Sequence, residues 1–590
     1  MPKALDIFNR SADLKTIYYL GQLSDGTMLT PNEAEAGHFL LWASVFGRKL
    51  YHGIVIDPDY FDYITEPVGE YLTRIELFAT MRQRPGSDRG QAKTSNNQAE
   101  MQAAHHWYYG SGIGELNLEI FATPRELAAF ASICASDGES RRGPAKQVLD
   151  ASNRLSEGVA DTSTKQKSTL TGQSTGADEI ADPPLWLSMR LEAKATSSVG
   201  VNLIGYANGV LGIGEDIRAT ARALGNGGIP FSILNVALPE AITPSQTTDL
   251  TGFFVDRPIF PVNVFCMTLF ETERMRMEIG SDMFRGRYNI GYWPWELPAL
   301  PSVWHHAFDH LDEIWALSPY LVEVFSRYTD KPVILMPPGV AIGPVEPFDL
   351  GTLGIEPRTF VFLTMLDFNS FMSRKNPIGT VDAFKQAFPH QKSAERLIIK
   401  TINGDTHADE FDRLLAHVGS DPRIIVVDGT YSRAATNGLI SAADCLVSLH
   451  RAEGLGRTIA EAMLLETPVV ATDWSGSTAL IDDSTGFPVA YKLVPIPSGD
   501  YIGGDGCRWA EPLVEAAAKQ FRLVRKEPDL AKQKCTAAKS RIVREHGPGA
   551  VAARVAARLD QIAARWRPVK QSTGAGSKGL RGKRKRERRL

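Results

Sequence analysis

The stretch Leu449-His-Arg-Ala-Glu-Gly-Leu-Gly-Arg-Thr-Ile-Ala-Glu-Ala-Met463 carries the pattern on which the fold prediction rests. An apolar run, Cys445–Leu449, predicts a strand that ends where the stretch begins. A loop with two glycines follows, and the residues after Gly456 have the apolar spacing of a helix. A strand, a glycine loop and a helix in this order present the free N–H groups of a helix N-terminus to a bound anion.

The same alternation of short β-rich runs and helical patterns extends over about 197–566. Pro337-Pro338-Gly339 divides it into two parts. The strand candidates are Val201–Gly205, Phe231–Val236, Val262–Met267, Tyr288–Tyr292, Glu313–Leu317, Val333–Met336, Phe360–Leu366, Leu397–Ile402, Ile424–Val427, Cys445–Leu449 and Val469–Ala471. Alternation of this kind predicts parallel sheets covered by helices on both faces. We therefore expect an α/β fold with two facing, doubly wound, Rossmann-like domains and a ligand site in the cleft between them.

The chain has 590 residues, which is too long for one core, and its composition changes along its length. From Ala131 to Leu185 there is no Phe, Tyr or Trp, so this part cannot bury enough apolar surface to order itself. We expect six parts: a mostly helical N-terminal region (1–132), a disordered linker (133–195), a first Rossmann-like domain (196–342), a second (343–510), C-terminal helices that pack back on the core (511–568) and a disordered basic tail (569–590).

The cysteines, the apolar runs and the charged end of the chain indicate in which compartment the protein works. The five cysteines are scattered without CxxC spacing, which indicates neither a disulfide framework nor a zinc site. The first residues lack the apolar core of a signal peptide, and no apolar run approaches the roughly 18 residues that span a bilayer. We expect a cytoplasmic protein without a nucleic-acid partner. The Arg- and Lys-rich end, Arg581–Leu590, suits peripheral contact with an anionic membrane at its inner face, or is simply a solvated tail.

Two carboxylates flank the glycine loop of the opening stretch. Gly454 and Gly456 let the backbone approach a ligand closely, and Glu453 lies in the loop beside them. Glu461 falls on the first turns of the following helix, where it can accept hydrogen bonds from a ribose diol. One carboxylate on a loop and one on a helix indicate two different partners.

Two further loops follow predicted strands. Arg374 and Lys375 precede Pro377, a residue that favours the start of a helix. The glycine-rich loop Gly205–Glu215 lies where doubly wound folds bind phosphate, and Gly212 and Gly214 are its candidate ligand contacts. Its spacing is G-x-x-G-x-G rather than the dinucleotide G-x-G-x-x-G, so an NAD site is not indicated.

Glu453 and Glu461 form a Glu-x7-Glu pattern, and the string Glu-Gly-x-Gly-x-Thr-x-Ala-Glu-Ala-Met around it resembles glycosyltransferase family 4, the retaining GT-B glycosyltransferases of group 1. The resemblance implies that Glu453 contacts hydroxyls of the transferred sugar and that Glu461 binds the ribose. The donor-binding residues that it implies are Gly212, Gly214, Gly454, Leu455, Gly456, Thr458, Ile459 and Glu461.

The same resemblance assigns Lys375 to the leaving pyrophosphate. The family often has a second basic residue earlier in that loop, where this chain has Asp367, Asn369 and Ser370, so Arg374 is the candidate replacement. Glu296, in the segment Gly291-Tyr-Trp-Pro-Trp-Glu296, is a further catalytic candidate. Its neighbouring tryptophans either stack on a sugar ring or belong to the core.

The implied activity is retaining transfer of a hexosyl group from a UDP- or GDP-sugar to a glycan or lipid-linked acceptor, in bacterial polysaccharide or cell-envelope glycan synthesis. The implied chemistry uses the nucleotide-sugar as co-substrate and needs no metal or other cofactor. Three alternatives stay open: a nucleotide-sugar-binding module whose catalysis has decayed, a nucleotide-sugar epimerase, and a phosphorylase with a pyridoxal lysine.

Overall fold

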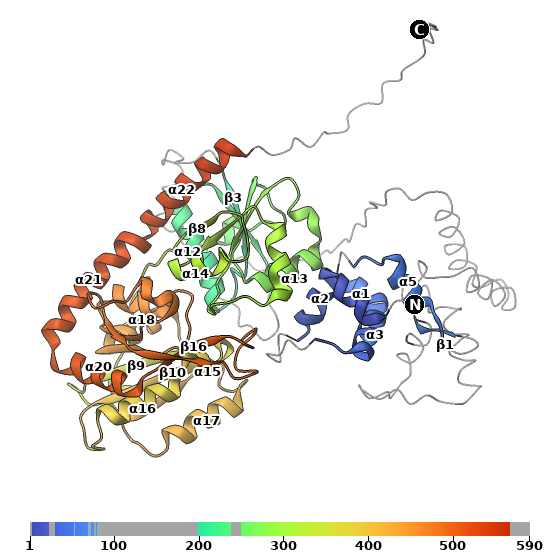
Figure 1. Ribbon diagram of the computed structural model, residues 1–590. Helices are drawn as coiled ribbons and strands as arrows, with labels where there is room; N and C mark the ends of the chain where they lie inside the picture. The colour runs from blue at the N-terminus through green and yellow to red at the C-terminus, as the bar shows by residue number, and fades with distance from the viewer. Residues whose placement is uncertain are drawn as a thin grey trace, which may run out of the picture.

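A computed structural model describes residues 3–22, 30–51, 54–68, 72–75, 78, 199–237 and 249–566. The expected linker (133–195) and basic tail (569–590) lie outside the described residues. Figure 1 shows two α/β domains one above the other, a group of helices beside the upper one, and a long pair of helices along one side.

The first domain is built on a six-stranded parallel sheet in the order β4-β3-β5-β6-β7-β8. Its strands are β3 (Val201–Gly205), β4 (Phe231–Asn235), β5 (Val262–Phe265), β6 (Tyr288–Tyr292), β7 (Glu313–Ala316) and β8 (Val333–Leu335). Its longer helices are α12 (Gly212–Asn226), α13 (Leu269–Ile279), the 3₁₀ helix η9 (Ser302–His310) and α14 (Pro319–Phe325). The central strands are buried on both faces, which explains why they consist mostly of apolar residues, with single polar residues such as Asn202, Asn263 and Glu313.

The second domain has a six-stranded parallel sheet in the order β11-β10-β9-β12-β13-β14. Its strands are β9 (Val361–Asp367), β10 (Arg396–Ile402), β11 (Ile424–Asp428), β12 (Cys445–Ser448), β13 (Val469–Thr472) and β14 (Phe487–Val489). Its helices are α15 (Met372–Lys375), α16 (Pro377–Ala387), α17 (Ala408–Val418), α18 (Arg433–Ala442) and α19 (Arg457–Leu464). The prediction of two parallel α/β domains is confirmed.

The strand order of each sheet determines where a ligand can bind. The order reverses between β3 and β5 in the first sheet and between β9 and β12 in the second. At such a point the loops leaving neighbouring strands turn to opposite faces and open a crevice at the carboxyl ends. Lys375 follows β9, Glu453 follows β12, and the glycine loop follows β3. All three loops singled out in the sequence therefore lie at reversal points.

The described part of the N-terminal region is mainly helical, as predicted. It contains α1 (Ala4–Arg10), α2 (Ala12–Leu20), α3 (Glu33–Trp42), the π-helix η2 (Ala43–Gly47), α4 (Arg48–Leu50), α5 (Pro58–Thr65) and the short strands β1 (Pro67–Val68) and β2 (Leu72–Thr73). These helices have their own aromatic core around Phe8, and α2 packs against α13 and η9 of the first domain.

The C-terminal helices return to the first domain. They are α20 (Val514–Lys526), α21 (Pro528–His546) and α22 (Pro548–Arg565), drawn in orange and red in Figure 1. Helix α20 covers the second sheet, where Phe521 stacks on Phe362 with ring centroids 4.9 Å apart. Helix α22 lies on α12, and Arg558 forms an ion pair with the buried Glu313 of β7.

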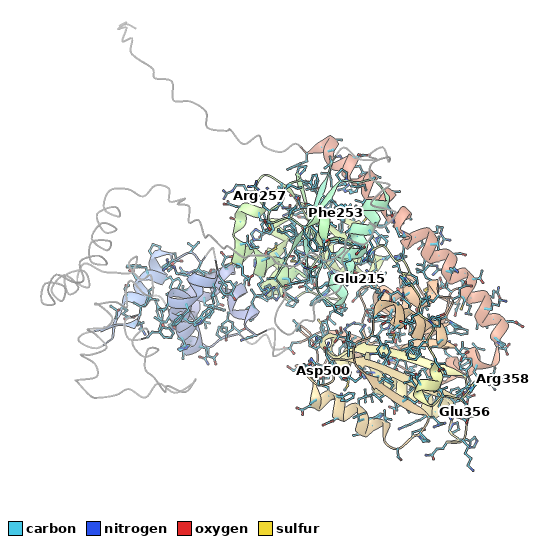
Figure 2. All side chains as sticks on the ribbon, turned by 180° about the vertical axis from the view of Figure 1, so that it is seen from behind. Glu215, Phe253, Arg257, Glu356, Arg358 and Asp500 are labelled. Atoms are coloured by element: carbon cyan, nitrogen blue, oxygen red, sulfur yellow. The ribbon has the colours of Figure 1, made fainter. Side chains whose placement is uncertain are left out.

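Strand β14 and a hairpin that follows it were not expected from the sequence. Strands β15 (Tyr491–Pro495) and β16 (Arg508–Pro512) form an antiparallel hairpin after β14. The predicted boundary between 510 and 511 falls inside β16 and is wrong as the start of the helical part, since α20 begins only at Val514. Figure 2 labels Asp500, in the loop of this hairpin, on the side of the lower domain that faces the upper one.

Candidate active site

The loop after β12 is held in place from three sides. The backbone N–H of Glu453 donates to Ser475 Oγ, and the N–H of Gly476 donates to the carbonyl of Glu453. A side chain at Gly454 would lie 2.7 Å from the carbonyl oxygen of Trp295 in the other domain, so only glycine permits this approach. Gly456 has a φ of 94° and begins the turn into α19. The loop is therefore a rigid interdomain contact.

Glu453 is nearly buried and lies between two cations. Lys375 Nζ donates to its Oε1, and Arg374 NH1 lies 3.2 Å from the same oxygen. Burial alone raises the pKa of Glu453, but the charges of Lys375 and Arg374 outweigh it and lower the pKa to about 2. Burial lowers the pKa of Lys375, and the neighbouring Arg374 adds to this effect against the pull of Glu453. The carboxylate is thus ionised at every physiological pH.

Arg374 is a buried organising residue in this arrangement. Its guanidinium donates to the backbone carbonyls of Ser370 and Ala452, on the two loops that it joins. It also lies 4.0 Å from Glu296 Oε1, which places Glu296 of the first domain beside Glu453 of the second. The four catalytic candidates are therefore brought together, while their roles stay predictions.

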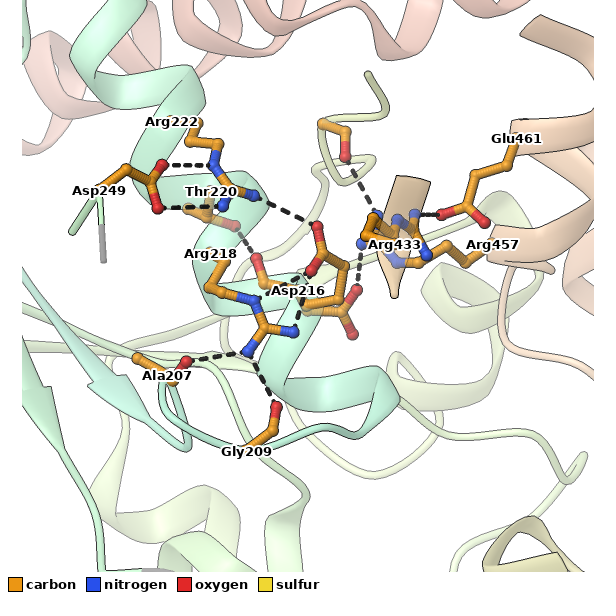
Figure 3. A network of polar contacts seen from close by, with 12 residues as sticks. Ala207, Gly209, Asp216, Arg218, Thr220, Arg222, Asp249, Arg433, Arg457 and Glu461 are labelled. Atoms are coloured by element: carbon orange, nitrogen blue, oxygen red, sulfur yellow. Dashed lines mark hydrogen bonds and ion pairs between the residues drawn. The ribbon is translucent and has the colours of Figure 1, made fainter. Parts of the chain in front are cut away.

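The donor-binding candidates gather at two helix N-termini that approach each other across the domains. Figure 3 shows Arg457, the first residue of α19, paired with Asp216 on the first turns of α12. Helix N-termini carry partial positive charge, so two of them with an arginine between them suit a diphosphate. Glu461 is nearly buried on α19 and pairs with Arg433, the first residue of α18. A ribose at Glu461 therefore has to share this carboxylate with Arg433 or displace it.

The glycines and apolar candidates differ in what they contact. Gly214 packs closely, since a side chain there would lie 2.4 Å from the carbonyl oxygen of Gly209, whereas Gly212 has open space around it. Arg218 holds the same loop by donating to the carbonyls of Ala207 and Gly209. Leu455 and Ile459 are buried, so only their backbone is available to a ligand, while Thr458 is partly exposed.

The tryptophans of the 291–296 segment belong to the core. Trp293 and Trp295 are buried, and their indole N–H groups donate to Thr272 Oγ1 and to the carbonyl of Ala299. The sugar-stacking interpretation of these rings is therefore wrong, because neither ring face is open to a ligand. His306, ten residues after Glu296, contacts Thr16 of α2 and Glu273 of α13.

Several residues of the site were missed in the sequence. Arg457 lies inside the quoted stretch, and its position at the start of a predicted helix was the available signal. Asp216, Arg433 and Tyr501 come from distant segments, and only the folded chain places them here. Among the described residues, no group of three or more His, Cys, Asp or Glu side chains is placed to hold a metal ion. Metal independence stays a prediction.

Two facing Rossmann-like domains enclose this site, and part of the chain matches a known family. Residues 370–495 match the family described as Glycosyl transferases group 1. The matched range contains Arg374, Lys375, Glu453 and Glu461. No curated protein matches the chain significantly.

Solved structures with a similar fold include three that the chain covers over their whole length. Sucrose-phosphate synthase from Thermosynechococcus elongatus is 15% identical, with 62% of this chain and 99% of that chain covered and a TM-score of 0.46. A glycosyltransferase from Rickettsia africae is 12% identical, with 62% and 100% covered and a TM-score of 0.45. HepE from Anabaena, solved with UDP and glucose, is 13% identical, with 62% and 100% covered and a TM-score of 0.43.

Within the described ranges, no helix combines the length and the apolar character needed to cross a bilayer. Membrane contact through the basic tail concerns residues outside these ranges and stays a prediction.

Proposed function

We propose that this chain is a retaining hexosyltransferase that uses a UDP- or GDP-sugar and a glycan or lipid-linked acceptor. The observation that carries the proposal is the meeting of Lys375, Glu453 and the α19 N-terminus at the strand-order reversal of the second sheet. The family match over 370–495 supports sugar transfer, and the Glu-x7-Glu pattern supports retention. We further propose a cytoplasmic setting in bacterial polysaccharide or cell-envelope glycan synthesis.

In the proposed reaction the bond between the anomeric carbon and the donor diphosphate breaks, and a bond to the acceptor oxygen forms on the same face. The proton of the acceptor hydroxyl passes to the departing diphosphate. Lys375 and the α19 N-terminus stabilise the negative charge that develops on the leaving diphosphate, without a metal. Glu453 accepts hydrogen bonds from sugar hydroxyls and supports the positive charge at the reacting carbon. The acceptor approaches from the first domain, beside Glu296.

The donor is identified by nucleoside diphosphate release from a panel of UDP- and GDP-sugars with the wild type and the Glu461→Ala variant. We expect release from one donor and a rise of about tenfold or more in its KM in the variant, because a hydrogen bond to a charged group is lost. Glu515→Ala, which removes an exposed glutamate from the first turn of α20, is the matched control and leaves KM unchanged.

An unchanged KM in Glu461→Ala contradicts the ribose contact. If no donor of the panel releases a nucleoside diphosphate, the next measurement is whether any of these donors raises the Tm of the wild type. A donor that stabilises the wild type without turnover supports the binding-module alternative. No stabilisation by any donor overturns the proposed function.

A further inference from the structure

The loop 496–507 of the β15–β16 hairpin belongs to the second domain in sequence but lies against the first. Tyr501 is 7% exposed, and its ring packs against Trp295 of the first domain and Phe371 of the second, with centroids 6.2 and 4.9 Å away. Gly503 has a φ of 66°, and a side chain there would lie 2.3 Å from Pro301. The tip of the hairpin therefore fits the first domain closely.

Tyr501 contacts two of the four catalytic candidates directly. Its hydroxyl donates to Glu296 Oε2, and the centroid of its ring lies 6.0 Å from the guanidinium carbon of Arg374. Burial raises the pKa of Tyr501 well above its usual value, so its hydroxyl keeps the proton that it donates. Arg374 in turn contacts Glu453, so one side chain of the hairpin reaches both carboxylates of the site.

The base of the hairpin is attached to the loop that carries Glu453. Arg451, two residues before Glu453, donates to both carboxylate oxygens of Glu511 at 2.7 and 3.0 Å. The backbone N–H of Ala510 donates to the carbonyl of Arg451. The hairpin is thus fixed to the Glu453 loop at its base and to Glu296 at its tip, which fits the role of a spacer between the two domains.

We propose that Tyr501 is a positioning residue, which holds Glu296 and Arg374 in the orientation that presents Glu453 to the transferred sugar. The inference rests on the proposed function and extends it to a hairpin outside the sequence motifs. Tyr501 acts through hydrogen bonding and packing and exchanges no proton with the substrate. Its loss is expected to slow the chemical step more than it weakens donor binding.

The Tyr501→Phe variant of the full chain tests this role, with the donor found by the panel. The ring stays and only the hydroxyl is removed, so we expect a fall of about tenfold in kcat, with the donor KM and the Kd for the nucleoside diphosphate within about twofold. Tyr288→Phe is the matched control, since Tyr288 also donates to a carboxylate, that of Glu313, at 3.0 Å, but at the amino-terminal end of β6, where its ring packs against Trp566.

A double-mutant cycle with Glu296→Gln separates positioning from stability. If Tyr501 acts through Glu296, the double variant has nearly the kcat of the slower single variant. The loss in Tm of Tyr501→Phe is expected to be similar to that of Tyr288→Phe. A kcat of Tyr501→Phe within twofold of the wild type, or fully multiplicative losses, overturns the inference and leaves the proposed function intact. A wild type without turnover on any donor overturns both.

Discussion

At the scale of single residues, the site combines charges of opposite sign that compensate one another before any ligand arrives. Glu453 is paired with Lys375 and Arg374, and Glu461 with Arg433. The diphosphate of a bound donor therefore has to compete with Glu453 and Glu461 for the positively charged side chains. This explains why the buried Arg374 and the partly buried Lys375 are tolerated beside a binding site, since unpaired charges there would be costly.

The charge of Lys375 predicts a pH dependence. Because burial lowers its pKa below the ordinary value of 10.5, the lysine loses its proton, and its attraction for the diphosphate, at a correspondingly lower pH. We expect kcat/KM to fall on the alkaline side below pH 10.5 in the wild type, and to stay level there in Lys375→Arg, whose guanidinium remains charged. The measurement is the pH profile of kcat/KM for both enzymes.

Lys539→Arg serves as the control, because Lys539 pairs with Glu466 on the surface and is expected to leave the profile unchanged. If kcat/KM of Lys375→Arg falls at the same alkaline pH as that of the wild type, another group causes the fall and the prediction is refuted. Glu453 contributes no acidic limb in the neutral range, because its pKa of about 2 keeps it ionised.

At the scale of elements, α12 and α19 approach each other with their N-termini, and the pair Asp216–Arg457 joins them. The two partners are expected to respond in opposite directions. Arg457→Gln removes a positive charge from the α19 N-terminus, and we expect the Kd for the nucleoside diphosphate to rise about tenfold. Asp216→Asn frees Arg457 for the ligand, so we expect the Kd to stay unchanged or to fall. Calorimetric titration of both variants measures this.

Arg525→Gln is the control for this pair, since Arg525 contacts Glu395 on the outer side of the second domain. A rise in Kd of similar size in Asp216→Asn and Arg457→Gln contradicts the prediction. It indicates instead that the pair acts only by holding the two domains together.

An element could be predicted when its own short stretch of sequence determines it, and it was missed when it depends on contacts with distant residues. The eight strands that do not lie at a sheet edge are largely buried, so their sequences are mainly apolar and recognisable. Strand β14 was missed because it is three residues long and contains Pro488. The β15–β16 hairpin was missed because only one face is covered and its strands are separated by a long loop, so their pairing depends on contacts with Arg451 and the first domain.

The residues of the site likewise fall into those that a short stretch of sequence reveals and those that only the fold brings together. Glu453, Lys375 and Glu461 were found because each follows a strand or begins a helix in a short, recognisable string. Arg433, the partner of Glu461, lies 28 residues away from it, and Asp216, the partner of Arg457, lies 241 residues away, so neither pair is visible in a local stretch of sequence. The tryptophans were ambiguous for a physical reason, since aromatic residues suit both a sugar site and a core.

At the scale of the whole molecule, the N-terminal helices sit on a buried charge cluster. Glu273 of α13 is fully buried and contacts Arg276, His306 and His310. Arg276 also pairs with Asp13 of α2 at 2.6 Å. Burial raises the pKa of Glu273, but the hydrogen bond from His306 and the charge of Arg276 lower it overall. The N-terminal helices are thus anchored to the first domain by charges as well as by packing.

The Glu273→Gln variant is expected to destabilise the chain by about 1–3 kcal/mol, because the buried Arg276 loses one of its two carboxylate partners and keeps only Asp13. Urea unfolding measures the loss, and limited proteolysis is expected to cleave the N-terminal helices sooner. Since the pKa of Glu273 is lowered, its contribution is complete above the ordinary value of 4.5 and is lost as the pH falls through the lowered value.

Glu278→Gln on the same helix is the matched control, because this side chain is 40% exposed and its nearest cation, Arg274, is 3.9 Å away. We expect it to change stability by less than about 1 kcal/mol. Equal losses in the two variants would mean that the buried cluster does not anchor the N-terminal helices.

The return of α22 to the first domain limits how this chain can be recombined. Ala552 of α22 fills the space beside Gly227 so closely that a side chain at Gly227 would lie 2.6 Å from it, and Trp566 packs edge-on to Tyr288. Helix α22 is therefore a structural part of the first Rossmann-like domain, although it is translated after the second. A chimera that exchanges the donor half with that of another enzyme should insert the foreign segment between β8 and α22 and keep the host's own final helix. Joining two halves at a single crossover would leave the surface of α12 that contacts α22 facing a helix that evolved against another surface.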